Sequence, residues 1–228
     1  MSLILYGISS PNVVKILIML EELSELFAFQ HIDLFSGSQF SADFQQLNPN
    51  SKVPLLVTHD GKAIFESGAI LLYLAEASGR FLPKEGNQRY DVIQWLMLQN
   101  TTVGPLLGQL NHFVSYAPEG EDYALGRYRR EAKRIYAMLD KRLEGFDYLA
   151  GHEYTIADMA TLPWTDYIEN HGLDRLDYPA LNRWRTALEQ REAVIRARRF
   201  MRDVQERDGE MFARASPTAR RRFLGLDE

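Results

Sequence analysis

The sequence contains no cysteine. Disulfide bridges, thiolate metal sites and a protein thiol acting as nucleophile are therefore excluded. Any thiol chemistry at this protein must use the sulfur of a bound ligand. The five histidines are scattered, and no two of them stand four residues apart as a helical zinc site requires. We therefore expect no bound metal.

Long hydrophobic runs are also lacking. The longest apolar stretches, near residues 16–20 and 69–75, are much shorter than the ~20 residues of a membrane-spanning helix. The N-terminus lacks the charged-then-apolar pattern of a signal peptide. These features predict a cytoplasmic protein without a membrane partner.

An excess of positive charge is missing as well, because the formal net charge is -5. Nucleic acid is a poor candidate partner, since phosphate binding depends on clustered Lys and Arg. Arginines do recur between residues 196 and 222, but Asp203, Glu206, Asp208 and Glu210 stand among them. Mixed charge is typical of an exposed surface, so we expect a solvated helix followed by a loose tail.

The N-terminal third alternates between strand and helix patterns. Its first helix is well marked, because Ser10 is a favoured N-cap and Pro11 is favoured at the first helical position. Asp60-Gly61 favours a tight hairpin between two short strands. The expected elements are strand 3–6, helix 12–23, strand 27–33, a helical segment 40–47, strands 54–58 and 63–65, and helix 67–77. This order predicts a mixed sheet covered by helices.

Residues 79–87 break the periodicity and predict a linker. The pattern after them is helical, with a single apolar stripe between residues 128 and 143. We therefore expect an α/β domain at 1–79, a linker at 80–88, an all-α domain at 89–205 and a C-terminal tail at 206–228. Within the helical domain, Thr155 and Asp158 have the spacing of a capping box, in which each side chain accepts a hydrogen bond from the other's backbone.

Ser10 is the sharpest candidate for chemistry. A hydroxyl at a helix N-terminus can donate to a ligand sulfur, and the helix dipole favours negative charge there. Both effects lower the pKa of a bound thiol, whose unperturbed value is ~8.5, and so raise the thiolate population. The alternative is that Ser10 only caps its helix. Ser9 is a neighbouring hydroxyl, and Tyr6 at the strand end is most simply interpreted as a core residue.

Several motifs occur together in a characteristic order. They are Ser10-Pro11-Asn12, Asn48-Pro49-Asn50-Ser51-Lys52-Val53-Pro54, Glu66-Ser67-Gly68-Ala69-Ile70 and Thr155-Ile156-Ala157-Asp158. Through them nearly the whole chain resembles the cytosolic glutathione transferases. Gly37-Ser38-Gln39-Phe40, Gly126-Arg127-Tyr128 and Asp140-Lys141-Arg142-Leu143-Glu144 look most like the bacterial nu class. The resemblance implies a thioredoxin-like N-terminal domain, an all-helical C-terminal domain and a homodimer.

The resemblance also implies roles for individual residues. Ser10, where nu-class relatives generally have threonine, and Asn12 would stabilise the thiolate of bound glutathione. Pro54 would be a cis proline that presents the backbone of Val53 to the cysteinyl unit of the peptide. The remaining glutathione contacts would be Glu66 and Ser67 at the γ-glutamyl end, Lys52 and Gln39 at the glycyl end, and Arg127 toward a second glutathione.

These roles favour a glutathione-dependent disulfide-bond reductase with peroxidase or transferase side activity. Glutathione, reduced or oxidised, would be a substrate, and no tightly bound cofactor is expected. One alternative is a transferase that conjugates electrophiles, in a pocket lined by the helical domain around Asn111, His112 and Tyr116. A second alternative is a non-catalytic binding or regulatory module, since this fold also serves in proteins without turnover.

Overall fold

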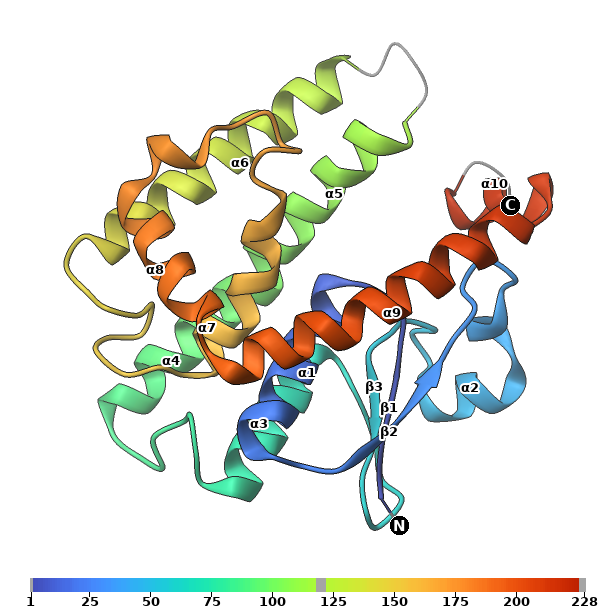
Figure 1. Cartoon of the computed structure of the whole chain (residues 1–228), viewed down its shortest axis with the longest axis horizontal. Coiled ribbons are helices and arrows are strands. Elements are labelled where there is room, and N and C mark those ends of the chain that lie inside the picture. The colour runs from blue at the N-terminus through green and yellow to red at the C-terminus, as the bar shows by residue number, and fades with distance from the viewer. Residues whose placement is uncertain (1, 118–121, 226–228) are drawn as a thin grey trace. The chain divides into compact units, whose positions relative to one another are not determined.

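The computed structural model describes residues 2–117 and 122–225 (Figure 1). The chain divides into two compact units. The first, here called the sheet unit, consists of residues 1–74 together with 192–228. The second, the helical unit, consists of residues 75–191.

The sheet unit is built on four short strands, β1 (Leu3–Gly7), β2 (Phe27–His31), β3 (Leu55–Val57) and β4 (Ala63–Phe65). Their order across the sheet is β2-β1-β3-β4, with β1 parallel to β2, and β3 antiparallel to both β1 and β4. Leu5 lies at the centre of the sheet, in register with Phe29 and Leu56, and is fully buried. A βαβ unit followed by an antiparallel hairpin is the thioredoxin-like arrangement that was expected.

Two helices connect these strands: α1 (Pro11–Leu23) and α2 (Ala42–Leu47), which follows the short 3-10 turn η1 (Ser38–Phe40). Helix α3 (Ser67–Ser78) follows the last strand. Helix α1 begins where the sequence predicts, with Ser10 as N-cap and Pro11 in the first turn, and it ends at Ser24 in the left-handed region. Its buried stripe includes Val13, Ile16 and Leu20. A Cβ at Gly7 would lie 2.8 Å from the Val13 side chain, so β1 approaches α1 closely where a glycine stands.

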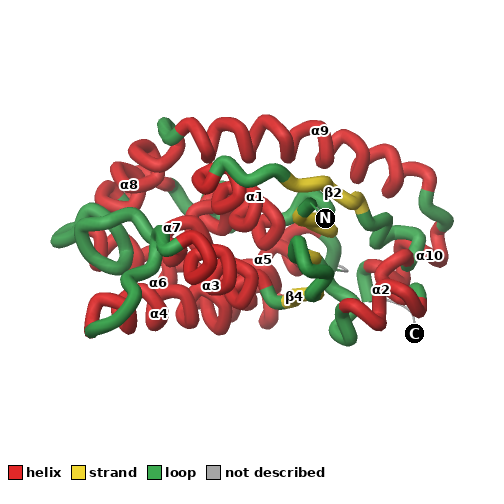
Figure 2. Tube along the Cα trace, turned by 90° about the horizontal axis from the view of Figure 1, so that it is seen from below, coloured by secondary structure: helices red, strands yellow, loops and turns green. Residues whose placement is uncertain are grey.

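The C-terminal segment differs from the expected solvated helix and loose tail. Helix α9 (Glu192–Arg214) packs its apolar stripe against the sheet unit, and α10 (Pro217–Phe223) follows it (Figure 2). The ring of Phe200 lies 5.2 Å from that of Phe29 on β2, and Arg196 donates to the Glu21 carboxylate on α1 at 2.6 Å. The expected boundary at residue 205 therefore falls inside a helix. Arginines on the solvent side of α9 obscure its apolar stripe in the sequence.

The helical unit contains α4 (Asn87–Leu98), η2 (Gln99–Val103), α5 (Gly104–Ser115), α6 (Asp122–Leu143), α7 (Ile156–Thr161), η3 (Leu162–Tyr167), η4 (Arg175–Asp177) and α8 (Pro179–Glu189). The capping box expected at the start of α7 is present. The Asp158 carboxylate accepts from the Thr155 backbone and side chain, from the Leu149 N–H at 2.9 Å and from the Trp184 indole at 3.0 Å. Burial nevertheless raises the pKa of Asp158 to about 6. One carboxylate thus ties α7 and α8 to the preceding loop.

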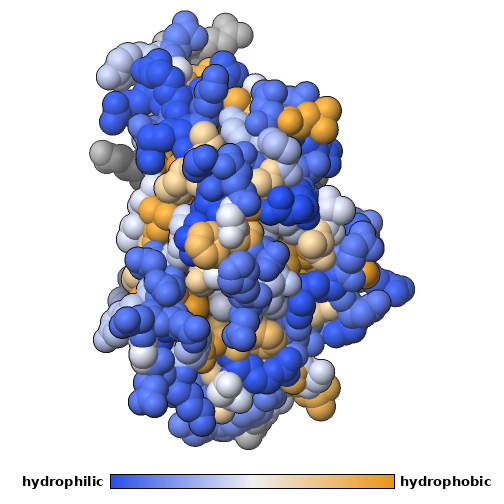
Figure 3. Space-filling view, turned by 90° about the vertical axis from the view of Figure 1, so that its left-hand side faces the viewer, coloured by the Kyte–Doolittle hydropathy of each residue, from blue (hydrophilic) through white to orange (hydrophobic). Residues whose placement is uncertain are grey.

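The face of the molecule drawn in Figure 3 is mostly hydrophilic. On the face drawn in Figure 3, apolar residues form small separate groups among polar ones. Among the helices of residues 2–117 and 122–225, none combines the length and apolarity needed to cross a bilayer.

Candidate functional site

The sheet unit contains a cavity of about 400 Å³ at the start of α1. Its volume is within the range of small-molecule sites. Five of the residues singled out in the sequence line it: Ser10, Asn12, Gln39, Lys52 and Val53. The rest of the wall comes from Ile8, from residues 34–37 and Phe40, from Asn50 and Ser51, and from Ala219, Arg222 and Phe223.

Ser10 stands at the junction of this cavity and α1. Its backbone is extended and its hydroxyl oxygen accepts the Val13 N–H at 3.3 Å, as an N-cap does. Because the hydroxyl serves the helix as an acceptor, its own proton is directed away from the cap and can be donated to a ligand. The start of α1 adds the positive end of a helix dipole. A thiol bound here would be stabilised as its thiolate.

The residue before Ser10 is held from the far end of the chain. The Asp208 carboxylate on α9 accepts from the backbone N–H of Ser9 at 2.7 Å and also from the Ser9 hydroxyl. The other carboxylate oxygen lies 2.6 Å from Nε2 of His31, at the end of β2. Asp208 is only 7% exposed, so these contacts are shielded from water. The network fixes the backbone that leads into the Ser10 cap.

Residues 50–53, within the stretch from Asn48 to Pro54, form another part of the cavity wall. The Val53-Pro54 peptide bond is cis, as the resemblance implied. The Asn48 side chain is buried and closes the loop, donating to the Lys52 carbonyl at 2.7 Å and accepting the Asn50 N–H at 2.9 Å. These contacts hold Lys52 and Val53 at the cavity surface.

Glu66 and Ser67 lie outside the residues that line this cavity. Ser67 is buried as the first residue of α3, and Glu66 before it has a positive φ of 65°. Such a backbone conformation is costly for a residue with a side chain and tends to occur at functional positions. Asn50, which does line the cavity, donates to the Glu66 carboxylate at 3.3 Å. That contact links the motif at residues 48–54 with the motif at residues 66–70.

The side chain of Gln39 has an acceptor oxygen that forms no hydrogen bond with the described residues. Its amide nitrogen donates to the Leu34 carbonyl at 3.4 Å, and it is 8% exposed. Among the described residues its Oε1 atom is buried without a hydrogen-bond partner. Buried polar atoms are normally satisfied, so this oxygen has the capacity to accept one further hydrogen bond.

Lys15 is a buried cation on α1. Burial lowers the pKa of its ammonium to about 7, while the Glu66 carboxylate attracts its charge and raises the pKa. Lys15 therefore offsets part of the negative charge of Glu66 from inside the protein. Sequence patterns assigned Lys15 no role.

Other sequence candidates have different surroundings. Tyr6 packs edge-on against Phe44, with ring centroids 6.1 Å apart, and lines a cavity separate from that of Ser10. Arg127 is exposed on α6 and belongs to the helical unit. The side-chain oxygen of Asn111 accepts a hydrogen bond from Nε2 of the buried His171 at 2.9 Å, so its amide is engaged in the interior of that unit.

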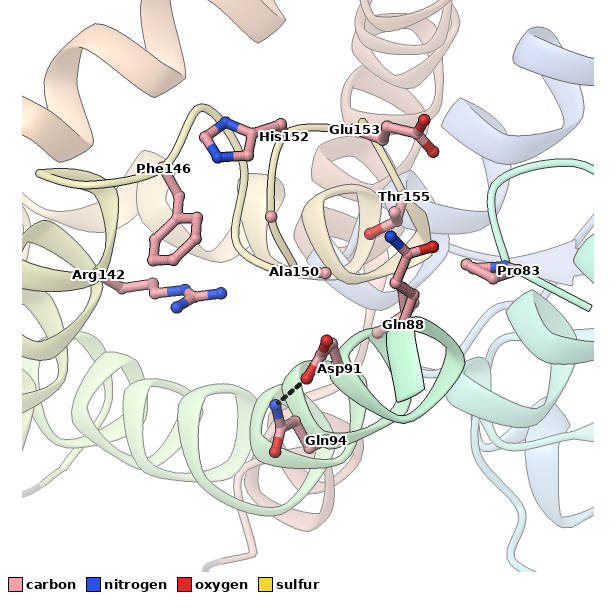
Figure 4. A pocket seen from close by; sticks show the side chains of 12 residues that line it. Pro83, Gln88, Asp91, Gln94, Arg142, Phe146, Ala150, His152, Glu153 and Thr155 are labelled. Carbon is pink, nitrogen blue, oxygen red and sulfur yellow. Dashed lines mark hydrogen bonds between the residues drawn. The ribbon is translucent and has the colours of Figure 1, made fainter. Parts of the chain in front are cut away.

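The helical unit has a cavity of its own, of about 520 Å³ (Figure 4). Arg142 enters it from α6, with its guanidinium 3.6 Å from the Phe146 ring centre and its Nε donating to the Leu149 carbonyl at 2.9 Å. Asp91 accepts from Gln94 on the opposite wall. The arginine is thus occupied in holding the loop after α6, and of the sequence candidates only the cap residue Thr155 lines this cavity.

Asp208, Phe35 and the α10 residues Arg222 and Phe223 were not among the residues predicted for the site. Asp208 continues the buried apolar stripe of α9, and its position four residues after the apolar Val204 was the available signal. The α10 helix has a local signal too, because Ser216 caps it and Pro217 opens it.

Comparison with known proteins agrees with this architecture. Residues 1–76 match the family described as glutathione S-transferase, N-terminal domain, and residues 110–192 match glutathione S-transferase, C-terminal domain. The disulfide-bond oxidoreductase YfcG of Escherichia coli is 41% identical over 199 residues, which cover 85% of this chain and 93% of that protein.

Two solved structures are similar over most of their length. One is a glutathione transferase family member from Pseudomonas fluorescens with two glutathione bound, at a TM-score of 0.80 and 37% identity, covering 86% of this chain and 92% of that one. The other is a glutathione transferase from Pseudomonas putida with one glutathione disulfide bound per subunit. It has a TM-score of 0.79 and 34% identity, and the match covers 86% of this chain and 90% of that one. This chain therefore belongs to the glutathione transferase family, as an enzyme related to the nu-class disulfide-bond oxidoreductases.

Proposed function

We propose that this protein is a glutathione-dependent disulfide-bond reductase, with peroxidase or transferase side activity. The position of Ser10 carries the proposal, because its hydroxyl caps α1 and also lines the cavity. A sulfur placed there receives a hydrogen bond and the field of the helix dipole. Asn12, in the first turn of α1, adds a side-chain amide that can donate to the same sulfur.

Residues of the cavity wall and residues outside it supply the binding contacts. The backbone of Val53 pairs with the cysteinyl unit of glutathione, and Lys52 and Gln39 bind the glycyl end. Ser67 binds the γ-glutamyl carboxylate at the start of α3, while Glu66 pairs with the ammonium group. Arg127 binds a second glutathione.

The reaction needs no protein cysteine. The thiolate of one glutathione attacks a sulfur of the substrate disulfide, which forms a mixed disulfide and releases a thiolate that takes up a proton. The thiolate of a second glutathione then attacks the glutathione sulfur of the mixed disulfide, and the second substrate thiolate leaves and is protonated. One disulfide is reduced to two thiols, and two glutathione molecules are oxidised to glutathione disulfide.

The relatives support this direction over simple conjugation. YfcG is a disulfide-bond oxidoreductase, and the Pseudomonas structures hold two glutathione molecules or one glutathione disulfide. The test is reduction of hydroxyethyl disulfide by glutathione, followed by coupled reduction of the glutathione disulfide formed. Turnover there is the expected result. Fast conjugation of an aromatic halide without disulfide turnover would indicate a classical transferase, and calorimetry without glutathione binding would indicate a non-catalytic module.

We further propose that the enzyme is a cytoplasmic homodimer. Tyr90 and Met97 on α4 are large apolar residues, 71% and 40% exposed, and they stand seven positions apart, on one side of the helix. Such residues are typical of an interaction surface. Sedimentation equilibrium should give twice the chain mass, and the double variant Tyr90→Glu with Met97→Glu should sediment as a monomer.

A further inference from the structure

Helix α10 contributes part of the cavity wall. Ala219, Arg222 and Phe223 line the cavity together with Ser10 and Lys52, and all of them belong to the sheet unit. Figures 1 and 2 both show α10 at the same end of this unit as α2. Helix α10 is therefore placed to contact whatever the cavity binds.

Specific contacts hold α10 in this position. Its N-cap Ser216 accepts the Ala219 N–H at 3.1 Å, and Arg220 donates to the Ala213 carbonyl on α9 at 2.5 Å. The ring of Phe35, in the loop before Gln39, lies 4.7 Å from that of Phe223 and 5.2 Å from that of Phe212. Because edge-to-face ring pairs stabilise packing beyond simple burial, α10 is fastened to the loop that carries Gln39.

The charges of the cavity wall favour an anion. Among the described lining residues, Lys52 and Arg222 are cationic and none is acidic. Within residues 2–117 and 122–225, Arg222 forms no ion pair with an acidic side chain, whereas Arg196 and Arg214 on α9 do. A planar guanidinium binds a carboxylate through two parallel hydrogen bonds, so Arg222 suits a carboxylate ligand.

Among the described residues, the side-chain oxygen of Gln39 has no hydrogen-bond partner, and this indicates which type of carboxylate ligand suits the cavity. A glycyl unit presents an amide N–H one carbon away from its carboxylate. The buried Oε1 atom of Gln39 can accept that N–H, while a cation of the same wall takes the carboxylate. Gln39 and Arg222 lie on segments joined by the Phe35–Phe223 contact.

We propose that Arg222 is a specificity-determining residue, which acts with Lys52 to bind the glycyl carboxylate of the peptide thiol in this cavity. This inference rests on the proposed use of glutathione and adds the C-terminal helix to its recognition. It follows that the enzyme discriminates between peptide thiols with a free and with a blocked C-terminal carboxylate.

The test is calorimetric binding of glutathione and of its glycyl monoethyl ester to the wild-type protein and to three variants. Arg222→Ala should weaken glutathione binding about tenfold, the size expected for one charged hydrogen-bonded contact, and should leave ester binding nearly unchanged. Arg222→Lys should recover part of the loss. Arg202→Ala removes the same charge from an exposed position of α9 and should match the wild type.

An equal loss for both ligands, or no loss for either, would overturn the inference. Failure of the proposed function has a different signature. If the wild type binds glutathione with the Arg222-dependent preference and does not reduce hydroxyethyl disulfide, the role of Arg222 stands and the reductase proposal fails. If the wild type prefers neither ligand, the role of Arg222 is wrong even where disulfide turnover is fast.

Discussion

The Asp208 carboxylate accepts a hydrogen bond from the backbone N–H of Ser9 at 2.7 Å, although the two residues are 199 positions apart. This contact stabilises the turn immediately before the Ser10 cap. The orientation of the Ser10 hydroxyl thus depends on a residue of helix α9 that does not line the cavity.

Replacing Asp208 by Asn should therefore lower activity indirectly. The amide keeps the shape of the carboxylate but turns one acceptor into a donor that faces Ser9 or His31. We expect kcat for disulfide reduction to fall about tenfold, KM for glutathione to change little, and the free energy of unfolding to drop by about 2 kcal/mol. Asp203→Asn, at an exposed position of α9, is the matched control and should behave as the wild type.

Removing the Ser10 hydroxyl should raise the pKa of bound glutathione. Ser10→Ala is expected to lower kcat/KM near neutral pH about a hundredfold, as loss of one preorganised donor does, while glutathione affinity changes much less. The thiolate absorbance of the complex, followed against pH, measures the effect directly. Ser10→Thr keeps the hydroxyl and should keep most of the activity. If the pKa of bound glutathione is the same in Ser10→Ala as in the wild type, Ser10 acts only as the N-cap of α1.

Arg127→Ala tests whether a second glutathione takes part. We expect the affinity for glutathione disulfide to fall about tenfold, because a charged contact to one of its halves is lost. Disulfide reduction should fall with it. Arg129→Ala changes a neighbouring exposed arginine of α6 and serves as control. Unchanged turnover in the Arg127 variant would contradict the two-peptide reaction.

Asp158 should be the most costly acidic residue of the helical unit to replace. Asp158→Ala leaves the buried N–H groups of Leu149, Thr155 and Trp184 without their acceptor. We expect the free energy of unfolding to fall by about 3 kcal/mol and the melting temperature to fall by roughly 6–12 °C, which calorimetry can measure. Asp147→Ala, at an exposed position, should change the melt by less than about 2 °C.

His171 should make stability depend on pH in weakly acidic solution. Burial lowers the pKa of its imidazole to about 4, whereas an unfolded histidine titrates near ~6.5. Between these values the unfolded chain binds a proton that the folded chain does not. The contribution of His171 to the free energy of unfolding is therefore fully present above the unfolded pKa of ~6.5. It is lost as the pH falls toward the folded pKa of about 4, by at most about 1.4 kcal/mol per pH unit.

Chemical denaturation at a series of pH values measures this slope. His171→Gln can keep hydrogen bonds to Asn111 and Tyr136 but cannot titrate, so its slope in that window should be smaller. His152→Gln is the control, because His152 is exposed beside Asp147 and should leave the slope as it is. An equal slope in the His171 variant would assign the pH dependence to other groups.

Local signals predicted the N-terminal elements well, because each depends on residues close in sequence. Ser10 and Pro11 mark the start of α1, and Asp60-Gly61 marks the hairpin of β3 and β4. The grouping of Ser10 with Gln39 and Lys52 needed more than local pattern. It was implied by family resemblance, and the cavity that these residues share agrees with it.

The C-terminal segment could not be predicted in the same way. An interspersed run of acidic and basic residues is locally indistinguishable from a solvated surface. Only the fold shows that Asp208 is buried against Ser9 and His31, and that Phe35 lies between rings of α9 and α10. Such contacts join residues more than a hundred positions apart, and no spacing rule covers them.

The return of α9 and α10 to the sheet unit has a consequence for biosynthesis. The strands and α1 are translated first, and the surface that α9 covers stays open until residues 192–223 have been made. Closing so long a loop is an entropically costly and late event in folding. A chain that stops short of α9 lacks the support of Ser9 and one wall of the cavity, so we expect it to lack the proposed reductase activity. Catalytic competence thus reports that translation has run through the final helices.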